Sequence, residues 1–279
     1  MKINVAKSAG FCFGVKRAID IAYKTLQTEN KIYMLGDIVH NEDIANQMLR
    51  AGIIKIKHLV RGRDKTLLIQ AHGTSKKIFE KAHSLGYIVV DATCPMVKEI
   101  HKIVVEMERQ GRKIIIIGDN KHQEVSGIIG QLNHKAIVID SIKHIPFKKI
   151  KIIKKAAVVV QSTQNLERTL LIVDILKQYI RDLKFFNTIC RPTRTKQQEI
   201  KVMPLENDLM IIIGSKTSAN TKRLYEICKS FNRRTYWVRS KDNVEPKWFR
   251  NVKTVGITAG ASTPDYTTQE VIEYIRKLN

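Results

Sequence analysis

The stretch Asp91-Ala92-Thr93-Cys94-Pro95 lies where a predicted strand ends and a predicted helix begins. An apolar run, Tyr87–Val90, precedes it, and apolar residues at helical spacing follow it from Met96 to Met107. Pro95 suits the first turn of a helix, where its missing N–H is not needed. The positive end of the helix dipole favours a thiolate at Cys94. For this stretch alone, a buried cysteine at a tight corner is the alternative interpretation.

The same arrangement of strand, cysteine and helix is predicted at two other places. Cys12 follows the short run Ile3–Ala6, and Cys190 follows the run Phe185–Ile189 and precedes a helical pattern that ends at Met203. Cys12 and Cys94 lie 82 residues apart, and Cys94 and Cys190 lie 96 residues apart. This nearly even spacing suggests three similar domains, each of which contributes one thiolate to a common centre.

The rest of the chain repeats an apolar strand, a small polar loop and an amphipathic helix. The strands of these six repeats are predicted at 31–35, 66–70, 113–117, 156–160, 209–213 and 254–257. Continuous Ile, Val and Leu runs are typical of parallel strands covered on both faces. Strands that alternate with helices predict an α/β fold with mostly parallel sheets, in which ligands bind at the carboxyl ends of the strands.

The length of 279 residues fits two or three domains better than one small core. We expect three similar α/β domains. They cover residues 13–94, residues 95–187, and residues 188–279 together with 1–12.

The formal net charge is +23, from 49 Lys and Arg against 26 Asp and Glu. The basic residues are spread along the chain, with short clusters such as Lys148-Lys149 and Lys154-Lys155. There is no basic arm, no aromatic pair of the RNA-recognition type and no zinc-finger spacing. We therefore expect solvated basic faces that attract a small polyanion, and no nucleic-acid partner, although RNA binding stays an alternative.

Nothing in the sequence predicts a membrane partner. No apolar run approaches the roughly 18–20 residues that a membrane span requires. The first residues, Met1–Val5, read as a strand and not as a signal peptide. We expect a cytoplasmic protein, in which thiols stay reduced and bind metal or take part in chemistry.

Three histidines follow predicted strands at equivalent loop positions: His40, His72 and His122. Imidazole can donate hydrogen bonds to phosphate oxygens. Hydroxyl and amide side chains precede predicted helices in the same way at Ser162, Thr163, Ser218, Asn220 and Ser262. These residues can cap helices, and a helix N-terminus lined with hydroxyls can also bind phosphate. Motifs for nucleotide binding are absent.

Three thiolates fit two kinds of metal site. A zinc site rich in cysteine usually contains a CxxC pair, which this sequence lacks. A 4Fe–4S cluster bound by three cysteines leaves one iron without a protein ligand, and that iron can act as a Lewis acid. The fourth cysteine, Cys228, has apolar neighbours at helical spacing and is expected in the core. Glu124, near a helix start, is either a surface residue or a proton donor.

Nine segments of the chain resemble the signature of the 4-hydroxy-3-methylbut-2-enyl diphosphate reductase family. They run in order from Phe11 to Asp265 and cover nearly the whole chain: GFCFGVKRAI, DIVHNEDI, AHGTS, DATCPMV, HQEVSGIIGQ, QSTQN, TICRPT, GSKTSANTKRL and TAGASTPD. The resemblance implies a trefoil of three α/β domains around one 4Fe–4S cluster per chain. It also implies cluster ligation by Cys12, Cys94 and Cys190.

The resemblance further implies the reaction and its site. The substrate is (E)-4-hydroxy-3-methylbut-2-enyl diphosphate, whose allylic hydroxyl would bind the unique iron. Two electrons from ferredoxin or flavodoxin, with Glu124 as the proton source, would give isopentenyl and dimethylallyl diphosphates, the last step of the methylerythritol phosphate route to isoprenoids. The residues implied in substrate binding are His40, His72, His122, Ser162, Thr163, Ser218, Asn220 and Ser262. An iron–sulfur hydro-lyase acting on a small phosphorylated substrate remains an alternative.

The sequence departs from the family pattern within three of these segments. Ser162 stands where the family usually has Thr, which keeps the hydroxyl. Ala219 stands where a Ser commonly contacts the diphosphate, so one donor is lost at a cost of roughly 0.5–1.5 kcal/mol. Gln123 replaces a usual Pro before Glu124.

Overall fold

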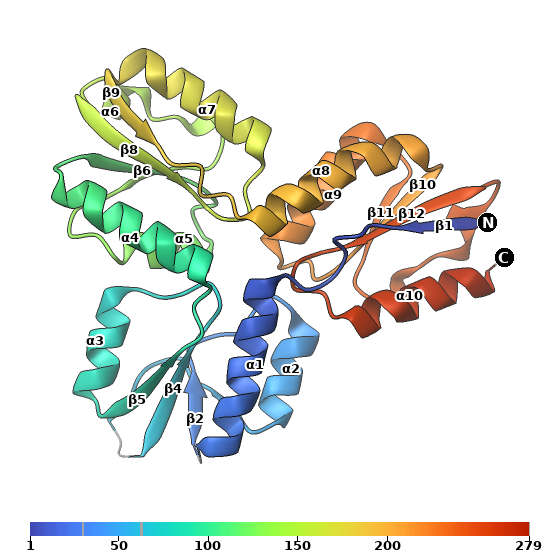
Figure 1. Cartoon of the computed structure of the whole chain (residues 1–279), viewed down its shortest axis with the longest axis horizontal. Coiled ribbons are helices and arrows are strands. Elements are labelled where there is room, and N and C mark those ends of the chain that lie inside the picture. The colour runs from blue at the N-terminus through green and yellow to red at the C-terminus, as the bar shows by residue number, and fades with distance from the viewer. Residues whose placement is uncertain (30, 62–63, 279) are drawn as a thin grey trace. The chain divides into compact units, whose positions relative to one another are not determined.

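The protein is built from parallel sheets flanked by helices (Figure 1). The computed structural model describes residues 1–29, 31–61 and 64–278. Its strands are β1 (Lys2–Val5), β2 (Ile32–Met34), β3 (Ile54–Lys55), β4 (Lys65–Ile69), β5 (Tyr87–Asp91), β6 (Lys113–Ile117), β7 (Ile137–Ile139), β8 (Lys155–Val160), β9 (Asp182–Phe185), β10 (Leu209–Ile213), β11 (Thr235–Val238) and β12 (Thr254–Ala259). Its α-helices are α1 (Phe13–Thr28), α2 (Glu42–Arg50), α3 (Lys76–Ser84), α4 (Pro95–Arg109), α5 (Gln123–Ile129), α6 (Phe147–Ile150), α7 (Leu166–Tyr179), α8 (Arg191–Glu206), α9 (Ala219–Phe231) and α10 (Asp265–Lys277). Short 3₁₀ turns are η1 (Ile142–His144), η2 (Lys241–Asn243) and η3 (Pro246–Phe249).

The described strands form three four-stranded sheets. Their orders are β1-β12-β10-β11, β3-β2-β4-β5 and β7-β6-β8-β9. Each neighbouring pair runs parallel. The predicted α/β class with mostly parallel sheets is therefore confirmed.

The chain divides into two compact units. The first contains residues 1–16, 40–45 and 191–279, and the second contains residues 17–39 and 46–190. The sheet β1-β12-β10-β11 lies in the first unit and the other two sheets lie in the second. The three domain ranges and the trefoil expected from the sequence stay predictions.

In the first unit, both faces of the sheet are buried, as the continuous apolar runs predicted. Leu209, Ile211 and Ile213 of β10 pack with Val271 and Ile275 of α10. The alternate residues of the same strand pack against α8 and α9 on the other face (Figure 1). Cys228 belongs to this second cluster and is 0% exposed, which confirms that it is a core residue.

In the second unit, the sheet β7-β6-β8-β9 follows the same rule. Ile115 and Ile117 of β6 face a cluster that contains α7, and Ile114 and Ile116 face a cluster that contains α4 and α5. Side chains alternate between the faces of a strand, so a run of isoleucines fills two cores at once.

The three predicted corner cysteines each lie directly before a helix. α1 begins at Phe13, α4 at Pro95 and α8 at Arg191, so each helix starts one residue after Cys12, Cys94 or Cys190. This feature of the sequence prediction is confirmed.

The strand predicted at Phe185–Ile189 is wrong in its position along the chain, because β9 covers Asp182–Phe185 and ends where the predicted strand begins. Beyond it, the Thr188 hydroxyl accepts a hydrogen bond from Val160 N at 2.7 Å and donates one to Val160 O at 2.6 Å. A side chain thus replaces the strand ladder at this point. The predicted helix end at Met203 is also too early, since α8 continues to Glu206 with Pro204 in its last turn.

Three strands were missed in the sequence: β3, β7 and β11. Each lies at the edge of its sheet. β3 has two exposed residues, and β7 has three residues of which Ile139 alone is buried. Strands of two or three residues are too short to give a clear signal in the sequence, even where every residue is apolar, as in β7.

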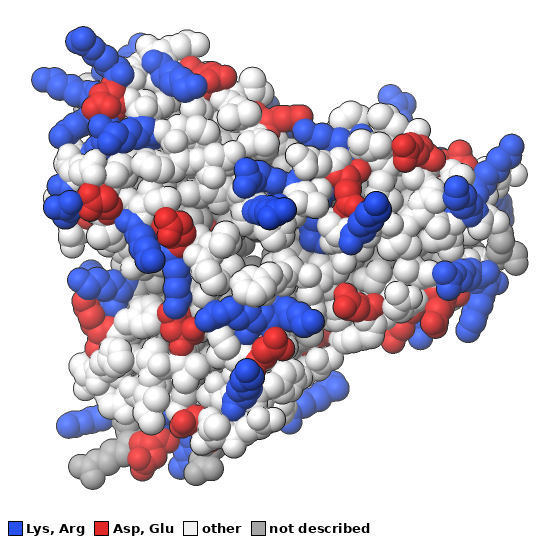
Figure 2. Space-filling model, in the orientation of Figure 1, with Lys and Arg blue, Asp and Glu red and all other residues white. Residues whose placement is uncertain are grey.

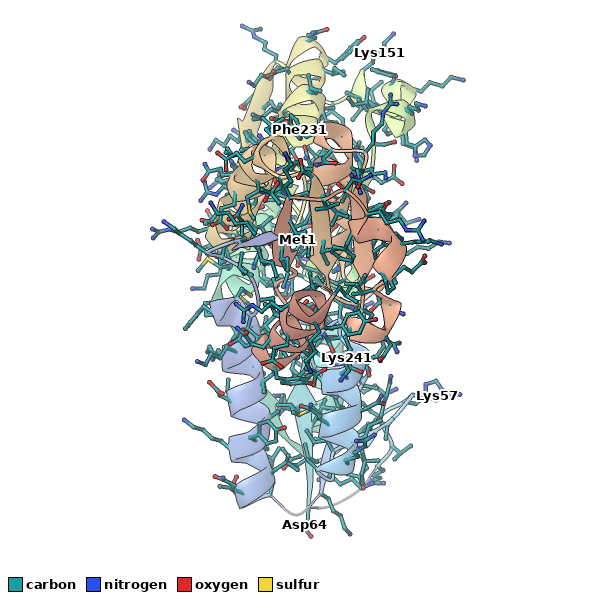
Figure 3. The ribbon with its side chains drawn as sticks, turned by 90° about the vertical axis from the view of Figure 1, so that its right-hand side faces the viewer. Met1, Lys57, Asp64, Lys151, Phe231 and Lys241 are labelled. Atoms are coloured by element: carbon teal, nitrogen blue, oxygen red, sulfur yellow. The ribbon has the colours of Figure 1, made fainter. Side chains whose placement is uncertain are left out.

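Basic side chains are scattered over the face of the molecule drawn in Figure 2, with acidic side chains between them. Side chains such as Lys57 and Lys151 are exposed and point away from the ribbon (Figure 3). Among the described helices, none has both the length and the apolar character that crossing a membrane would take.

Gly130 provides a test of the packing inside the second unit. A Cβ at Gly130 would lie 2.1 Å from Ser75 Cβ and 2.7 Å from Ser75 Cα, so the backbone itself would have to move. We expect Gly130→Ala to lower the free energy of unfolding by about 1–3 kcal/mol, measured by urea denaturation.

The matched control is Gly127→Ala, three residues earlier in the chain. A Cβ there meets Thr74 N at 3.5 Å, which is ordinary contact. Alanine also favours the helix by up to about 1 kcal/mol. Equal stability of the two variants would contradict the packing described for Gly130.

Candidate functional site

Cys12 lies in the first unit with its sulfur beside the start of α1. Val15 N points at Cys12 Sγ from 3.5 Å, and Cys12 N donates to Ala261 O at 3.0 Å. The side chain is half-buried. The sulfur of Cys12 thus lies at a helix N-terminus, with a backbone N–H directed at it.

Cys94 and Cys190 lie in the second unit, and each is fixed to a loop predicted to carry function. Cys94 N donates to Ala71 O, next to His72, at 2.9 Å. Cys190 N donates to Ser162 O at 3.1 Å. Both cysteines are half-buried at helix N-termini, the environment that activates thiols.

Glu124 is a buried carboxyl group on α5, with 3% of its surface exposed. Its Oε1 accepts a hydrogen bond from Ser162 N at 2.6 Å, and its Oε2 accepts one from the Ser162 hydroxyl at 2.7 Å. Burial raises the pKa of Glu124, and the charge of Asp119 adds to this, while the bonds from Ser162 act in the opposite direction. A carboxyl group with a raised pKa can hold a proton for transfer.

The other predicted residues of the second unit lie at the start of α5 and on the loops beside it. His122 caps α5, with Nδ1 accepting from Glu124 N at 3.1 Å. The Thr163 hydroxyl accepts from Gln161 Nε2 at 3.1 Å. A Cβ at Gly127 of α5 would lie 3.6 Å from His72 O, so this helix packs on the His72 loop.

The predicted residues of the first unit form a second cluster. The Ser262 hydroxyl donates to His40 O at 3.0 Å. Asn220 Oδ1 accepts from Ala261 N at 2.9 Å, and Ala261 O is the acceptor for Cys12. The structure therefore brings His40, Asn220 and Ser262 together with Cys12.

Helix capping explains only part of the predicted hydroxyl and amide set. Ser218 caps α9 by accepting from Thr221 N at 3.3 Å. The prediction that Asn220 precedes this helix is wrong, because Asn220 is the second residue of α9. Asn165, and not Ser162, caps α7. The Ser162 hydroxyl donates a hydrogen bond to the Glu124 carboxyl group, and the Ser262 hydroxyl donates one to His40 O, so neither hydroxyl caps a helix.

Asn220 carries the clearest sign of a ligand in the first unit. Its side chain is 4% exposed, and its Nδ2 has no hydrogen-bond partner within the described part of the chain. Leaving such a donor unpaired costs about 1–3 kcal/mol. An acceptor oxygen of a ligand would remove this cost.

Lys196 is a residue of this region that the sequence prediction missed. It is 3% exposed, and its ammonium group donates to Gly10 O at 3.0 Å, to Ala259 O at 3.1 Å and to Ser8 O. Burial lowers the pKa of Lys196 to about 8, although the negative charges of Cys12, Glu199 and Asp265 oppose this shift.

Glu199, one turn further along α8, fixes the same segment. Its carboxylate accepts from Lys7 N at 2.9 Å and from Ser8 N at 3.0 Å. Together with Lys196, it holds the chain that leads from β1 to Cys12. A signal was present in the sequence, because Lys196 lies at helical spacing from the buried Thr193 and Ile200.

Lys196→Met tests this role. The variant leaves three buried carbonyl groups without their shared donor, and we expect the free energy of unfolding to fall by about 2–4 kcal/mol. Urea denaturation measures this loss. Lys222→Met, at an exposed lysine of α9, is the control and should change stability by less than about 0.5 kcal/mol. A similar loss in both variants would contradict the assignment.

The thiols fit an iron–sulfur cluster by their chemistry. Cys12, Cys94 and Cys190 are half-buried thiols at helix N-termini, whereas burial raises the pKa of Cys228 to about 11. Within residues 1–29, 31–61 and 64–278, no group of three His, Cys, Asp or Glu side chains is arranged to hold a single metal ion. Cys12 belongs to one unit, and Cys94 and Cys190 belong to the other.

Known proteins resemble the chain over its whole length. A protein of Aquifex aeolicus, named 4-hydroxy-3-methylbut-2-enyl diphosphate reductase, is 38% identical over 280 residues, which are 99% of this chain and 96% of the relative. A protein of Caldanaerobacter subterraneus with the same name is 38% identical over 285 residues, 100% of this chain and 98% of the relative.

Solved structures agree with these relatives. The structure of (E)-4-hydroxy-3-methyl-but-2-enyl diphosphate reductase, described as the terminal enzyme of the non-mevalonate pathway, is 37% identical with a TM-score of 0.73 and covers 99% of this chain and 100% of its own. The E-1-hydroxy-2-methyl-but-2-enyl-4-diphosphate reductase of Plasmodium falciparum is 28% identical with a TM-score of 0.90, over 98% of this chain and 87% of its own. Residues 3–276 match the family described as LytB protein, and the chain belongs to this family.

Proposed function

We propose that the protein catalyses the reductive dehydroxylation of (E)-4-hydroxy-3-methylbut-2-enyl diphosphate. The allylic C–O bond breaks, two electrons and two protons are consumed, and one water leaves with isopentenyl or dimethylallyl diphosphate as the product. The family relatives named for this reductase, which match the whole chain, support the proposal.

The observation that carries the proposal is the buried Glu124. Loss of a hydroxyl group as water and formation of a new C–H bond both require a proton. Glu124 lies at the carboxyl ends of the strands of its sheet, burial raises its pKa, and Ser162 fixes both of its oxygens, so the carboxyl group is suited to carry this proton. We assign it as the proton donor.

The diphosphate is the part of the substrate that we assign to the cluster of predicted residues in the first unit. His40, Ser218, Asn220 and Ser262 gather hydrogen-bonding groups there, and Asn220 Nδ2 is a buried donor that lacks a partner within the described residues. We assign His72, His122, Ser162 and Thr163 to the substrate as well. At Ala219 the missing hydroxyl leaves the backbone N–H groups at the start of α9 as donors.

We assign Cys12, Cys94 and Cys190 as the ligands of one 4Fe–4S cluster per chain. When bound, the cluster would pass the two electrons, one at a time, from an electron carrier to the substrate and would offer a Lewis-acidic iron. The electrons would come from ferredoxin or flavodoxin. We place the reaction in the cytoplasm, where such thiols stay reduced.

A turnover assay with a chemically reduced dye tests the function. The protein is purified without oxygen, mixed with substrate and the dye, and the two C5 diphosphate products are quantified. We expect turnover that depends strictly on the reductant. Loss of substrate at the same rate without any reductant, with neither of these two products formed, would point to a hydro-lyase and contradict the proposal.

Two cysteine variants test the ligand assignment. Cys94→Ser should lose most bound iron and the brown colour, because a hydroxyl is a poor ligand for this cluster. Cys228→Ser, the matched control at a core cysteine, should keep both. Iron and sulfide content per chain is the measurement. Iron retained in the first variant and lost in the second would overturn the assignment.

Glu124→Gln tests the proton donor. The amide keeps the shape of the side chain but cannot supply the proton, so kcat should fall by about 10²–10⁴-fold while the cluster content stays unchanged. The pKa of Glu124 is raised, so in the parent enzyme this carboxyl group should stay protonated at pH values above the usual titration range of a glutamate. The kcat of the parent should then fall as the pH rises through the raised pKa of Glu124.

The exposed Glu80→Gln on α3 is the control for this variant and should retain the parent rate and pH profile. Equal kcat in Glu124→Gln and the parent would remove Glu124 from the reaction.

A further inference from the structure

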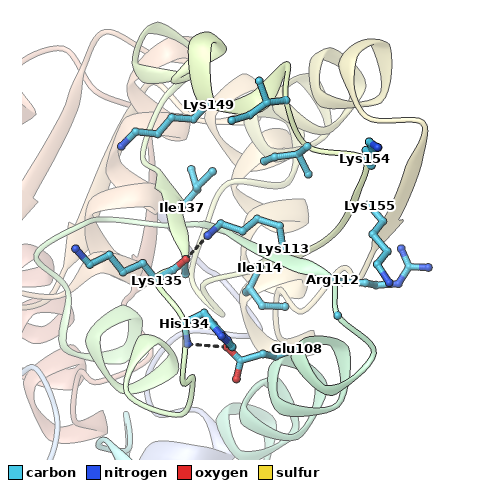
Figure 4. Close-up of a pocket in the computed structure, with 14 residues that line it drawn as sticks. Glu108, Arg112, Lys113, Ile114, His134, Lys135, Ile137, Lys149, Lys154 and Lys155 are labelled. Carbon is cyan, nitrogen blue, oxygen red and sulfur yellow. Dashed lines mark hydrogen bonds and ion pairs between the residues drawn. The ribbon is translucent and has the colours of Figure 1, made fainter.

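A pocket of about 770 Å³ lies at the amino ends of β6, β7 and β8 in the second unit (Figure 4). The loops of Glu124 and Ser162 leave the opposite, carboxyl ends of β6 and β8. We call this the basic pocket, because six basic side chains line it: Arg112, Lys113, Lys135, Lys149, Lys154 and Lys155. The proposed function gives it no role.

Apolar side chains complete the lining of the basic pocket. Ile114 is buried, Ile137 and Ile153 are half-buried, and Ile152 is 80% exposed. An isoleucine this exposed, directly after Lys151 in the chain, stabilises nothing in the core. The pocket therefore offers apolar contact and positive charge within one concave surface.

Part of the positive charge is already fixed by the protein. Arg112 forms a two-point ion pair with Asp182, at 2.8 and 2.9 Å. The Lys113 ammonium donates to Lys135 O at 2.6 Å (Figure 4), and that of Lys155 donates to Gln110 O at 3.0 Å.

The remaining basic side chains keep their charge for a ligand. Lys135, Lys149 and Lys154 pair with no carboxylate of the described residues. Glu108, the acidic residue of the lining, is occupied by the backbone N–H groups of Asn133 and His134, both at 2.9 Å.

We propose that the basic pocket binds one molecule of an anionic amphiphile, with a phosphate-type head and a hydrocarbon chain. Lys149 and Lys154 supply positive charge that attracts the head, and the chain lies on Ile137, Ile152 and Ile153. The volume is within the range of about 300–1,000 Å³ that is usual for small-molecule sites. This binding is independent of the proposed reaction.

The lining disfavours two other occupants. It contains no Phe, Tyr or Trp ring on which a nucleic-acid base could stack. A flat anionic membrane surface cannot fill a concave pocket, although its phosphate groups share the chemistry of the head. The experiment therefore separates a single dissolved molecule from a bilayer.

Dodecyl phosphate, below the concentration at which it forms micelles, is the probe. Its binding to the cluster-containing protein is measured by calorimetry, with inorganic phosphate as the test of charge alone and phosphatidylglycerol vesicles as the test of a bilayer. We expect one equivalent of dodecyl phosphate to bind, and more tightly than inorganic phosphate. Equal binding of the two phosphates, or binding to vesicles without binding of the single molecule, would overturn the proposal.

Variants locate the binding. The double variant Lys149→Glu, Lys154→Glu should weaken binding by at least about tenfold, because two attractive charges become repulsive. Ile152→Ser should weaken it by about threefold through lost apolar contact. The control Lys57→Glu, Lys77→Glu makes the same change in net charge at exposed sites outside the pocket.

The three altered proteins are compared by thermal unfolding to establish that each is folded. Their side chains are exposed, so their melting temperatures should match that of the parent. Equal affinity of the pocket variant and the charge-matched control would contradict the assignment of the ligand to the basic pocket.

Discussion

Parallel pairing of the strands is the constraint on which the functional regions depend. In a parallel sheet all strands end at the same edge, and each strand must be followed by a crossover that returns to the other edge. In this protein most crossovers contain α-helices, so polar loops and helix N-termini gather at the carboxyl edge. The cluster of His40, Asn220 and Ser262 lies at the carboxyl edge of one sheet. The pair of Glu124 and Ser162 lies at the carboxyl edge of another sheet.

A repeated fold does not give repeated contacts around the three thiols. Cys12 is bonded to Ala261, and Lys196 and Glu199 of α8 hold the segment before it. The backbone N–H of Cys94 donates a hydrogen bond to Ala71, the residue before His72, and the backbone N–H of Cys190 donates one to Ser162. Each loop is thus fixed by residues distant in the chain, which lowers the entropy that the loop would otherwise lose when a ligand binds.

The central strands and the position of Cys12, Cys94 and Cys190 directly before helices could be predicted from the sequence, for a physical reason. Buried parallel strands need continuous apolar runs, and a helix that begins after a cysteine shows its period at once. Edge strands such as β3 and β7 are held by one neighbour and are only two and three residues long, so they carry little signal. Lys196 escaped prediction because a lysine in a helix is usually solvated, and only the carbonyl groups of distant segments make its burial favourable.

The position of Ser162 explains why its departure from the usual Thr leaves the local structure intact. Its N–H and hydroxyl both donate to Glu124, and its carbonyl accepts from Cys190. All three polar groups of the residue are therefore used, and a serine supplies each of them as well as a threonine. The methyl group that distinguishes threonine takes part in none of these bonds. One residue consequently orients the proposed proton donor and fixes a proposed cluster ligand, so the chemistry of this corner depends on the hydroxyl and the backbone and not on the size of the side chain.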